Sequence, residues 1–165
     1  MAEPFAPGRV YVGLDSDRKS SGSHENGERS LGVAILVVTA ERVLMAVILI
    51  VEDDVFIREI AELMIQDWGH QTLAASDVDE ALAVLRSPQH IDALFTDINL
   101  KTAVLGGFDL APQAIVLRPK LRVLYTTGNS MSDKIKALFV EGARFLPKPY
   151  AQYQLKNSVE ELLAA

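Results

Sequence analysis

The sequence predicts an α/β protein with a doubly wound sheet of five parallel strands and helices on both faces. Short apolar runs that are typical of strands alternate with longer segments in which apolar residues recur at helical spacing. The strand-like runs are apolar almost throughout, as expected when helices cover both faces of a sheet. Because strand–helix–strand crossovers within one sheet are right-handed, this alternation favours parallel strands.

The elements can be assigned in order from residue 45 onward. The first strand is a run of five apolar residues, and the helix after it is closed by Gly69. The second helix opens with a capping signature, in which Asp77 precedes Glu80 by three residues, and it stops at Pro88. The predicted strands are 47–51, 71–75, 91–97, 121–127 and 144–147, and the predicted helices are 55–68, 76–88, 108–117, 132–140 and 151–163.

Pro112 conflicts with the third of these helices. In a helix interior, proline removes a backbone hydrogen bond and crowds the preceding turn, at a cost of about 3 kcal/mol. We therefore expect that this helix either begins near Ala111 or is kinked.

Composition limits the possible functions. With 165 residues, 49% of them hydrophobic, the chain has material for one globular domain. Sixteen basic and 22 acidic residues give a net charge of −6, which argues against direct nucleic-acid binding. The sequence has no cysteine, so disulfides and a cysteine nucleophile are excluded. This fits a reducing compartment, and we expect a cytoplasmic location.

Residues 1–44 are predicted to form a disordered or poorly ordered extension ahead of a domain at 45–165. Residues 1–30 are rich in glycine, proline, serine and charge, and residues 31–44 are compatible with either a strand or an apolar helix. Glu41 and Arg42 interrupt the apolar run, so we expect neither a transmembrane helix nor a signal peptide. Met45 directly precedes the first strand, and an alternative is that translation naturally starts there.

Polar side chains, together with one glycine, stand at the ends of four of the five predicted strands. They are Glu52, Asp53 and Asp54 after the first strand, Asp97 at the end of the third, Thr127 and Gly128 at the end of the fourth, and Lys148 after the fifth. Functional sites of such sheets lie at the carboxyl ends of the strands, so these residues should share one rim. Neighbouring carboxylates repel, and a hard cation such as Mg²⁺ would relieve the repulsion. Lys148 and Thr127 are suited to holding phosphoryl oxygens.

Four motifs stand in order at these strand ends: LIVEDD, LFTDINL, VLYTTGNS and FLPKPY. In these motifs and in their spacing, the chain resembles the receiver domain of bacterial two-component response regulators. The resemblance covers about residues 47 to 163 and implies the flavodoxin-like (βα)5 fold of that family.

The resemblance implies how a phosphoryl group would be handled. Asp97 looks like the acceptor, which attacks a phosphohistidine of a sensor histidine kinase or a phosphotransfer protein. Thr127 and Lys148 would contact the phosphoryl oxygens. Phe145 lies where receivers carry an aromatic switch residue. In the family, this residue shifts the equilibrium between two states of a surface made by the fourth helix, fifth strand and fifth helix. That surface is also the candidate homodimer interface.

The resemblance also implies a Mg²⁺ site. Glu52 and Asp53 look like its acids, and Asp53, Asp97 and the backbone carbonyl of Asn99 would ligate the ion. Asp54 is not expected to be a direct ligand. Taken by themselves, Asp53 and Asp54 could equally be acids at the N-cap and in the first turn of the following helix, with no role in binding a metal ion.

Three features depart from the family. The loop after Asp97 is longer than usual and has Lys101 where a proline is common. Phe145 has no hydroxyl group, so a switch that uses a tyrosine hydrogen bond is excluded. Asn99 and Asn129 occupy positions that tune dephosphorylation in the family.

Residues outside the motifs are given structural roles. His70 and His90 have no partner pattern and are interpreted as surface or loop residues, and Trp68 as a core residue at a helix end. Phe145 is expected to pack in the core as well as to switch.

The leading prediction is a stand-alone phosphoacceptor that is not an enzyme and acts on an unknown downstream protein, because only one helix follows the last motif. A degenerate receiver that works without phosphate is an alternative, although no acid, threonine or lysine is missing. An aspartyl-phosphate phosphatase would place D-x-D-x-T after the first strand, where this chain has EDDV. A flavodoxin-like FMN protein would need a phosphate loop there, and three acids would repel the phosphate.

Overall fold

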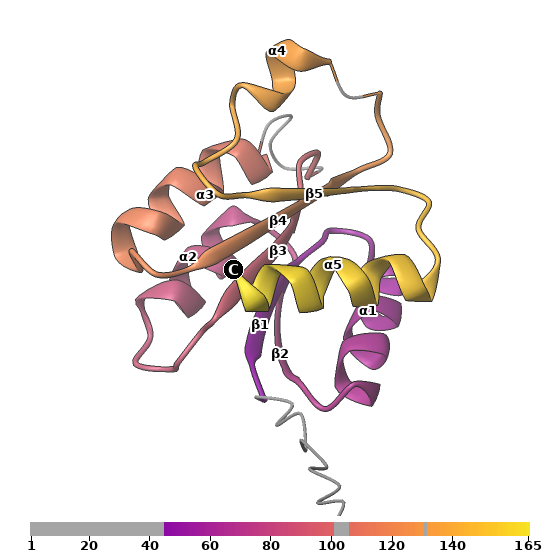
Figure 1. Cartoon of the computed structure of the whole chain (residues 1–165). Coiled ribbons are helices and arrows are strands. Elements are labelled where there is room, and N and C mark those ends of the chain that lie inside the picture. The colour runs from indigo at the N-terminus through magenta and orange to yellow at the C-terminus, as the bar shows by residue number, and fades with distance from the viewer. Residues whose placement is uncertain (1–44, 101–105, 131) are drawn as a thin grey trace, which may run out of the picture. The chain divides into compact units, whose positions relative to one another are not determined.

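The computed structural model describes residues 45–100, 106–130 and 132–165, and within them five parallel strands form one sheet in the order β2-β1-β3-β4-β5 (Figure 1). The strands are β1 (Val47–Val51), β2 (Gln71–Ala75), β3 (Ala93–Asp97), β4 (Arg122–Thr127) and β5 (Arg144–Pro147). The helices are α1 (Val55–Asp67), α2 (Val78–Arg86), α3 (Gly106–Leu117), α4 (Asp133–Lys136) and α5 (Gln152–Ala164). The predicted fold class is confirmed.

Some predictions fall outside these residues. The predicted disordered extension at 1–44 lies outside the described residues, as does the part of the loop after Asp97 at 101–105. Among the described helices, none combines the length and the apolar character that crossing a membrane requires.

Two helical layers enclose the sheet, with α1 and α5 on one face and α2 and α3 on the other (Figure 1). Successive residues of a strand point to opposite faces, so β1 contributes to two separate cores. Leu49 and Val51 pack with α2 and α3, whereas Ile48 and Ile50 pack with α1 and α5. All four are at most 1% exposed. This double burial explains why β1 is apolar at every position.

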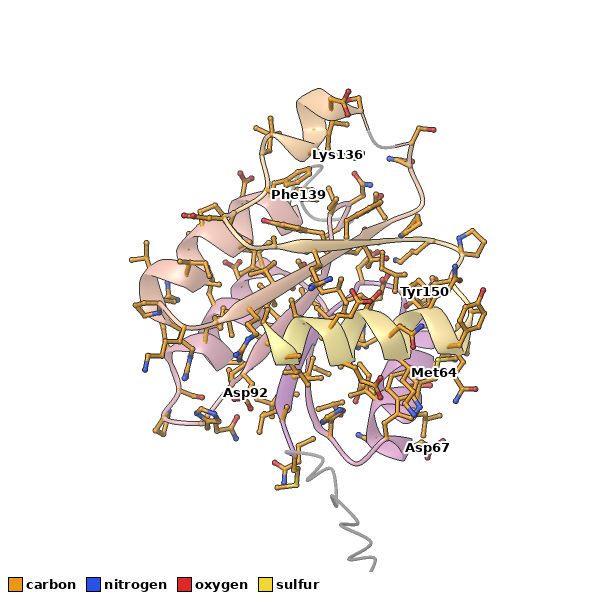
Figure 2. The ribbon with its side chains drawn as sticks, viewed as in Figure 1. Met64, Asp67, Asp92, Lys136, Phe139 and Tyr150 are labelled. Atoms are coloured by element: carbon orange, nitrogen blue, oxygen red, sulfur yellow. The ribbon has the colours of Figure 1, made fainter. Side chains whose placement is uncertain are left out.

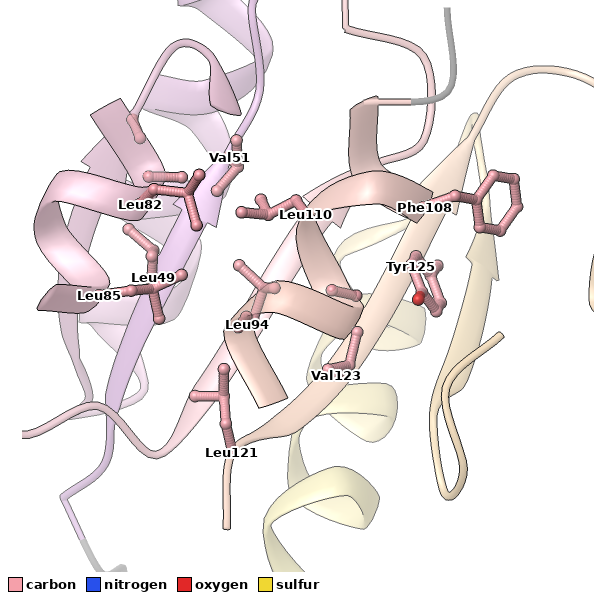
Figure 3. Close-up of a cluster of buried hydrophobic side chains, with 14 of the residues drawn as sticks. Leu49, Val51, Leu82, Leu85, Leu94, Phe108, Leu110, Leu121, Val123 and Tyr125 are labelled. Atoms are coloured by element: carbon pink, nitrogen blue, oxygen red, sulfur yellow. The ribbon is translucent and has the colours of Figure 1, made fainter. Parts of the chain in front are cut away.

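The core between the sheet and α2–α3 is built from aliphatic side chains, many of them leucines, with the aromatic rings of Phe108 and Tyr125 at one end (Figure 3). Phe108 of α3 and Tyr125 of β4 lie side by side there, with 5.4 Å between ring centroids. Each such side chain contributes on the order of 1.5–3 kcal/mol when buried. Packing therefore fixes α3 against β4 close to the carboxyl ends of the strands.

The capping signature of α2 is present, but the helix begins at Val78 rather than at residue 76. The Asp77 side chain accepts a hydrogen bond of 2.9 Å from the Glu80 amide. The Glu80 carboxylate in return accepts bonds of 2.8 Å from the backbone amide and hydroxyl of Ser76. Because Ser76 and Asp77 form the cap, they lie outside the helix.

The fourth helix is shorter than the predicted 132–140, since α4 is a single turn, Asp133–Lys136. Beyond it the chain turns toward the sheet and places Phe139 on Tyr125, with ring centroids 4.5 Å apart and planes 25° apart. Gly142 then adopts a φ of +74°, a conformation that favours glycine. We attribute the early end of the helix to this packing of Phe139.

The third helix begins at Gly106 and continues through Pro112, so the expectation that it begins near Ala111 is wrong. Pro112 cannot donate to the carbonyl of Phe108 four residues earlier. Phe108 and Leu110, which precede the proline, are both buried. Their burial compensates for the missing bond.

His70 lies in a loop as expected, but it is buried and hydrogen-bonded. Its ring is 9% exposed, and its Nδ1 accepts a bond of 3.3 Å from the Ala46 amide. Burial lowers the pKa of His70, against the smaller opposing effect of the Glu160 and Asp92 carboxylates. His90 is exposed, as expected, and it pairs with Asp92 at 2.8 Å, a contact that no sequence pattern had indicated.

Folding stability should fall as the pH is lowered below 6.5, the ordinary pKa of histidine, through ionisation of His70. The unfolded chain, with a histidine pKa of 6.5, binds a proton more readily than the native state, where the pKa is lower. The stabilisation by neutral His70 is therefore complete above pH 6.5 and is lost as the pH falls through the lowered pKa. Urea unfolding of His70→Gln should show a shallower pH dependence than that of wild type.

His90→Gln is the control for this experiment, because His90 is exposed. It should not make the pH dependence shallower in the way His70→Gln does. Equal pH dependence in His70→Gln and wild type would contradict the assignment.

Candidate functional site

Three acids from two strand ends meet at the point where the strand order reverses. β1 lies between β2 and β3, and Val51 pairs with Thr96, so the residues after β1 lie beside Asp97 at the end of β3. Such reversal points are the binding crevices of open α/β sheets. Glu52, Asp53 and Asp97 each offer a carboxylate oxygen, and these oxygens lie within 4.8 Å of one another. The structure therefore brings the three predicted acids together.

The turn that carries Glu52 and Asp53 is fixed by the start of α1. Asp54 is the N-cap and accepts hydrogen bonds from the amides of Phe56 at 2.9 Å and Ile57 at 3.2 Å. Arg58 of α1 donates to the backbone carbonyl of Glu52 at 2.5 Å. These contacts hold the acidic turn in one conformation.

Lys148 lies between two of the acids. Its Nζ donates to the Glu52 carboxylate and, at 2.7 Å, to Oδ2 of Asp97. The side chains are 14% (Lys148), 6% (Glu52) and 10% (Asp97) exposed, so this is a largely buried ion-pair network.

Burial and charge act in opposite directions on this network. Burial raises the pKa of Glu52, and the bond to Lys148 opposes that effect only in part. For Lys148, burial lowers the pKa, but the bonds and charges of Asp97 and Glu52 outweigh it, so the pKa is raised. Lys148 therefore stays protonated and supplies positive charge to the acids.

Asn99 connects Asp97 to Thr127. Its backbone amide donates to Oδ1 of Asp97 at 2.9 Å, and its side-chain amide donates to the hydroxyl oxygen of Thr127 at 2.6 Å. Thr127 ends β4 and is 2% exposed. From the sequence, Asn99 was expected to provide a carbonyl ligand and to occupy a position that tunes dephosphorylation, but this contact was not expected, because no pattern shows a contact between residues in different loops.

Gly107, which the sequence interpretation missed, lies in the first turn of α3 directly against β3. A Cβ atom there would stand 2.3 Å from the carbonyl oxygen of Asp97 and 2.8 Å from Cα of Ile98. The Gly107 amide donates to the carbonyl of Ile98 at 3.2 Å. Only glycine allows α3 to pass this close to Asp97.

Phe145 lies apart from the acids, in an aromatic cluster that comprises Phe108, Tyr125, Phe139 and Phe145. Its ring centroid is 6.0 Å from that of Phe139, which follows α4 (Figure 2). It is half-buried and packs on the α2–α3 core, in agreement with the expected packing role. Tyr125 and Phe139 were not expected in this cluster, because the sequence predicted Phe139 inside a helix.

An apolar surface adjoins the acids. Phe56, Ile60 and Leu63 on α1 are 72%, 52% and 62% exposed. Next to them is a hollow of about 380 Å³ that reaches Lys148; Met64 and Tyr150, which contribute to it, are labelled in Figure 2. An apolar patch of this kind on a protein surface is typical of a binding site.

The chemistry of the acid cluster fits a hard divalent cation. Carboxylate oxygens are the ligands that Mg²⁺ prefers. One carboxylate oxygen from each of Glu52, Asp53 and Asp97 lies within 4.8 Å of the other two, so all three can reach one ion. Glu52, Asp53 and Asp97 are thus suited to bind Mg²⁺.

A family model described as the response regulator receiver domain matches residues 48–160. The chain is also similar to the crystal structure of a response regulator receiver protein from Sinorhizobium medicae, with 26% identity and a TM-score of 0.67 over 74% of this chain and 97% of that one. It resembles the chemotaxis protein CheY4 of Vibrio cholerae with 26% identity and a TM-score of 0.64, over 72% of this chain and 99% of that one.

Among curated proteins, the chain is 22% identical over 116 residues to a protein of Porphyridium aerugineum named probable transcriptional regulator ycf27. The match covers 70% of this chain and 47% of that protein. The chain thus spans about half the length of the curated relatives it matches.

Replacing Lys148 by alanine is expected to lower the free energy of unfolding by about 3 kcal/mol without divalent cations, because two buried carboxylates lose their counter-charge. Mg²⁺ should recover part of this loss by neutralising the same carboxylates. Urea unfolding with and without Mg²⁺ measures both effects.

Lys156→Ala is the matched control, since its ion pair with Glu160 is exposed. Its effect should stay within about 0.5 kcal/mol with or without Mg²⁺. A Lys148→Ala variant that Mg²⁺ stabilises no more than wild type would contradict our interpretation of the site.

Gly107→Ala is expected to destabilise the protein by about 1–3 kcal/mol, because the added methyl group overlaps the backbone of β3. Helix propensity alone would make the same change stabilising by about 1 kcal/mol. The sign of the change in the free energy of unfolding therefore shows which of the two effects dominates. Gly128→Ala serves as the control, since a Cβ at Gly128 meets nothing within 4 Å. A gain in stability for Gly107→Ala in urea unfolding would rule out the predicted overlap.

Proposed function

Because the chain belongs to the response regulator receiver domain family, a module of two-component signalling, we propose that Asp97 accepts a phosphoryl group from a sensor histidine kinase or a phosphotransfer protein. The observation that carries the proposal is the arrangement of Lys148 between Asp97 and Glu52, with Asp53 beside them. A reactive carboxylate, an ammonium group and further acids thus share one rim of the sheet.

The proposed transfer is an in-line substitution at phosphorus. A carboxylate oxygen of Asp97 forms the new bond to phosphorus, and the phosphorus–nitrogen bond of the phosphohistidine breaks, so that the imidazole leaves with its electron pair. Asp97 then carries an acyl phosphate. Lys148 already bonds Oδ2 of Asp97 and can move to a phosphoryl oxygen as charge builds there.

The acid cluster supports a role for Mg²⁺ in this step. Glu52, Asp53, Asp97 and the backbone carbonyl of Asn99 would hold the ion. When bound, Mg²⁺ supplies charge neutralisation for the phosphoryl oxygens. The carboxylates of Glu52, Asp53 and Asp97 would hold their negative charge in a fixed place beside the incoming phosphoryl group.

We propose that the phosphoryl group acts on a surface made by α4, β5 and α5. It adds about −1.5 to −2 charge at the rim. The Lys148 amide donates to the Thr127 carbonyl at 2.9 Å, so a movement of Thr127 would also displace the end of β5. Phe145 of β5 contacts Phe139 after α4, and this contact links the rim to the proposed output surface, which is also the candidate homodimer interface.

The apolar surface on α1 supports docking of the phosphodonor beside Asp97. The side chains of Phe56, Ile60 and Leu63 are exposed on α1, and Ile60 lines the hollow that also reaches Lys148. A protein that carries a phosphohistidine could bury these side chains while presenting its phosphoryl group to Asp97.

Other parts of the predicted function are carried forward as proposals. We propose that the chain is a signalling module rather than an enzyme and that it acts in the cytoplasm on a downstream protein. A degenerate receiver that signals without phosphate is the main alternative, but Asp97, Thr127 and Lys148 are all present.

Incubation with Mg²⁺ and acetyl phosphate should add one phosphoryl group to the wild-type protein, detected by intact mass. Asp97→Asn should gain none, because the amide is a poor nucleophile. Asp109→Asn, which removes an exposed carboxylate on α3, is the matched control and should gain phosphate like wild type. If wild type stays unmodified, or if Asp97→Asn gains as much as wild type, the proposed function is wrong.

A further inference from the structure

The hydroxyl group of Thr127 has a restricted hydrogen-bonding arrangement. Its oxygen accepts a bond of 2.6 Å from the Asn99 side-chain amide and one of 3.2 Å from the backbone amide of Asn129. A hydroxyl group has two lone pairs and one proton. In the part of the chain that the structure describes, Thr127 Oγ1 makes these two bonds and accepts in both. Both lone pairs are therefore occupied, and the proton is left to donate.

The two donors differ in origin. The Asn129 bond closes a short turn in which a threonine side chain accepts from the backbone amide two residues later, a local feature of threonine. The Asn99 bond crosses from the loop after β3 to the end of β4, over 28 positions in the sequence. Only this second bond ties the orientation of the hydroxyl to the neighbourhood of Asp97.

Asn99 is also attached to the acceptor itself. Its backbone amide donates to Oδ1 of Asp97 at 2.9 Å, so one residue contacts both the nucleophile and the hydroxyl. Asp97 and Thr127 are 8% and 2% exposed, so water competes little for either contact. In a buried site, a fixed donor stabilises developing negative charge without further reorganisation.

We propose that the side-chain amide of Asn99 is a positioning residue that holds the Thr127 hydroxyl as a donor toward a phosphoryl group on Asp97. The inference rests on the proposed function and adds a residue to it. By occupying a lone pair of Oγ1, Asn99 directs the single proton of Thr127 to the incoming oxygen.

The test is a double-mutant cycle on the rate of phosphorylation by acetyl phosphate with Mg²⁺, measured by intact mass. Asn99→Ala keeps the backbone amide that bonds Asp97 and removes only the side-chain amide. It should slow phosphorylation about threefold to tenfold, as expected for one neutral hydrogen bond. In a Thr127→Val background, which lacks the hydroxyl, Asn99→Ala should have almost no further effect.

Gln113→Ala is the matched control for loss of a side-chain amide. Gln113 donates to the Asp109 carbonyl at 2.9 Å on the exposed side of α3. The Gln113→Ala variant should be phosphorylated at the same rate as the wild-type protein. Equal slowing by Asn99→Ala in both backgrounds, or no slowing in either, would overturn the inference while leaving the proposed function intact.

A second measurement does not depend on phosphorylation. In the unmodified protein, the NMR signal of the Asn99 side-chain amide should shift on Thr127→Val, because its acceptor is lost. An unchanged signal would overturn the inference whatever the phosphorylation assay gives. A wild-type protein that gains no phosphate would overturn both the proposed function and the inference.

Discussion

The arrangement at the rim depends on one electrostatic constraint, which is that carboxylates gathered at the reversal point of the sheet need positive charge. Lys148 meets this need by bonding Glu52 and Asp97 together, at a position where little solvent screens the charges. The cation comes from the end of β5, and the acids come from the ends of β1 and β3. The ion-pair network therefore ties the end of β5 to the ends of β1 and β3, neither of which is its neighbour in the sheet. A bound metal ion or a phosphoryl group would change the hydrogen-bond partners of Lys148 and would therefore affect the ends of β1, β3 and β5.

The positions of these groups follow from packing. β1, β3 and β4 are buried on both sides, so their ends have little freedom to move. The start of α1 is fixed by the Asp54 cap, and the start of α3 is fixed by the contact of Gly107 with β3. A rigid base of this kind suits a site in which a few tenths of an ångström determine whether a donor reaches its acceptor.

Much of the fold and of the site could be predicted from the sequence because the relevant signals are local. Continuous apolar runs identify buried strands, and the polar residues at their ends must then meet at one edge, as Glu52, Asp53 and Asp97 do. Features set by contacts between distant segments were missed. The bond from Asn99 to Thr127, the approach of Gly107 to Asp97 and the bond of His70 to Ala46 leave no periodic pattern in the chain. Similarly, we attribute the early end of α4 to the stacking of Phe139 on Tyr125, a distant contact that helix propensity cannot indicate.

The division of the interior into two separate cores has a consequence for how the protein can diversify. Side chains under α1 and α5 do not touch those under α2 and α3, because the sheet stands between them. Changes in one layer should therefore combine with changes in the other with little mutual interference. Relatives with this architecture can thus change the surface of α1 while the aromatic cluster on the other side of the sheet stays as it is, and each layer can evolve at its own pace.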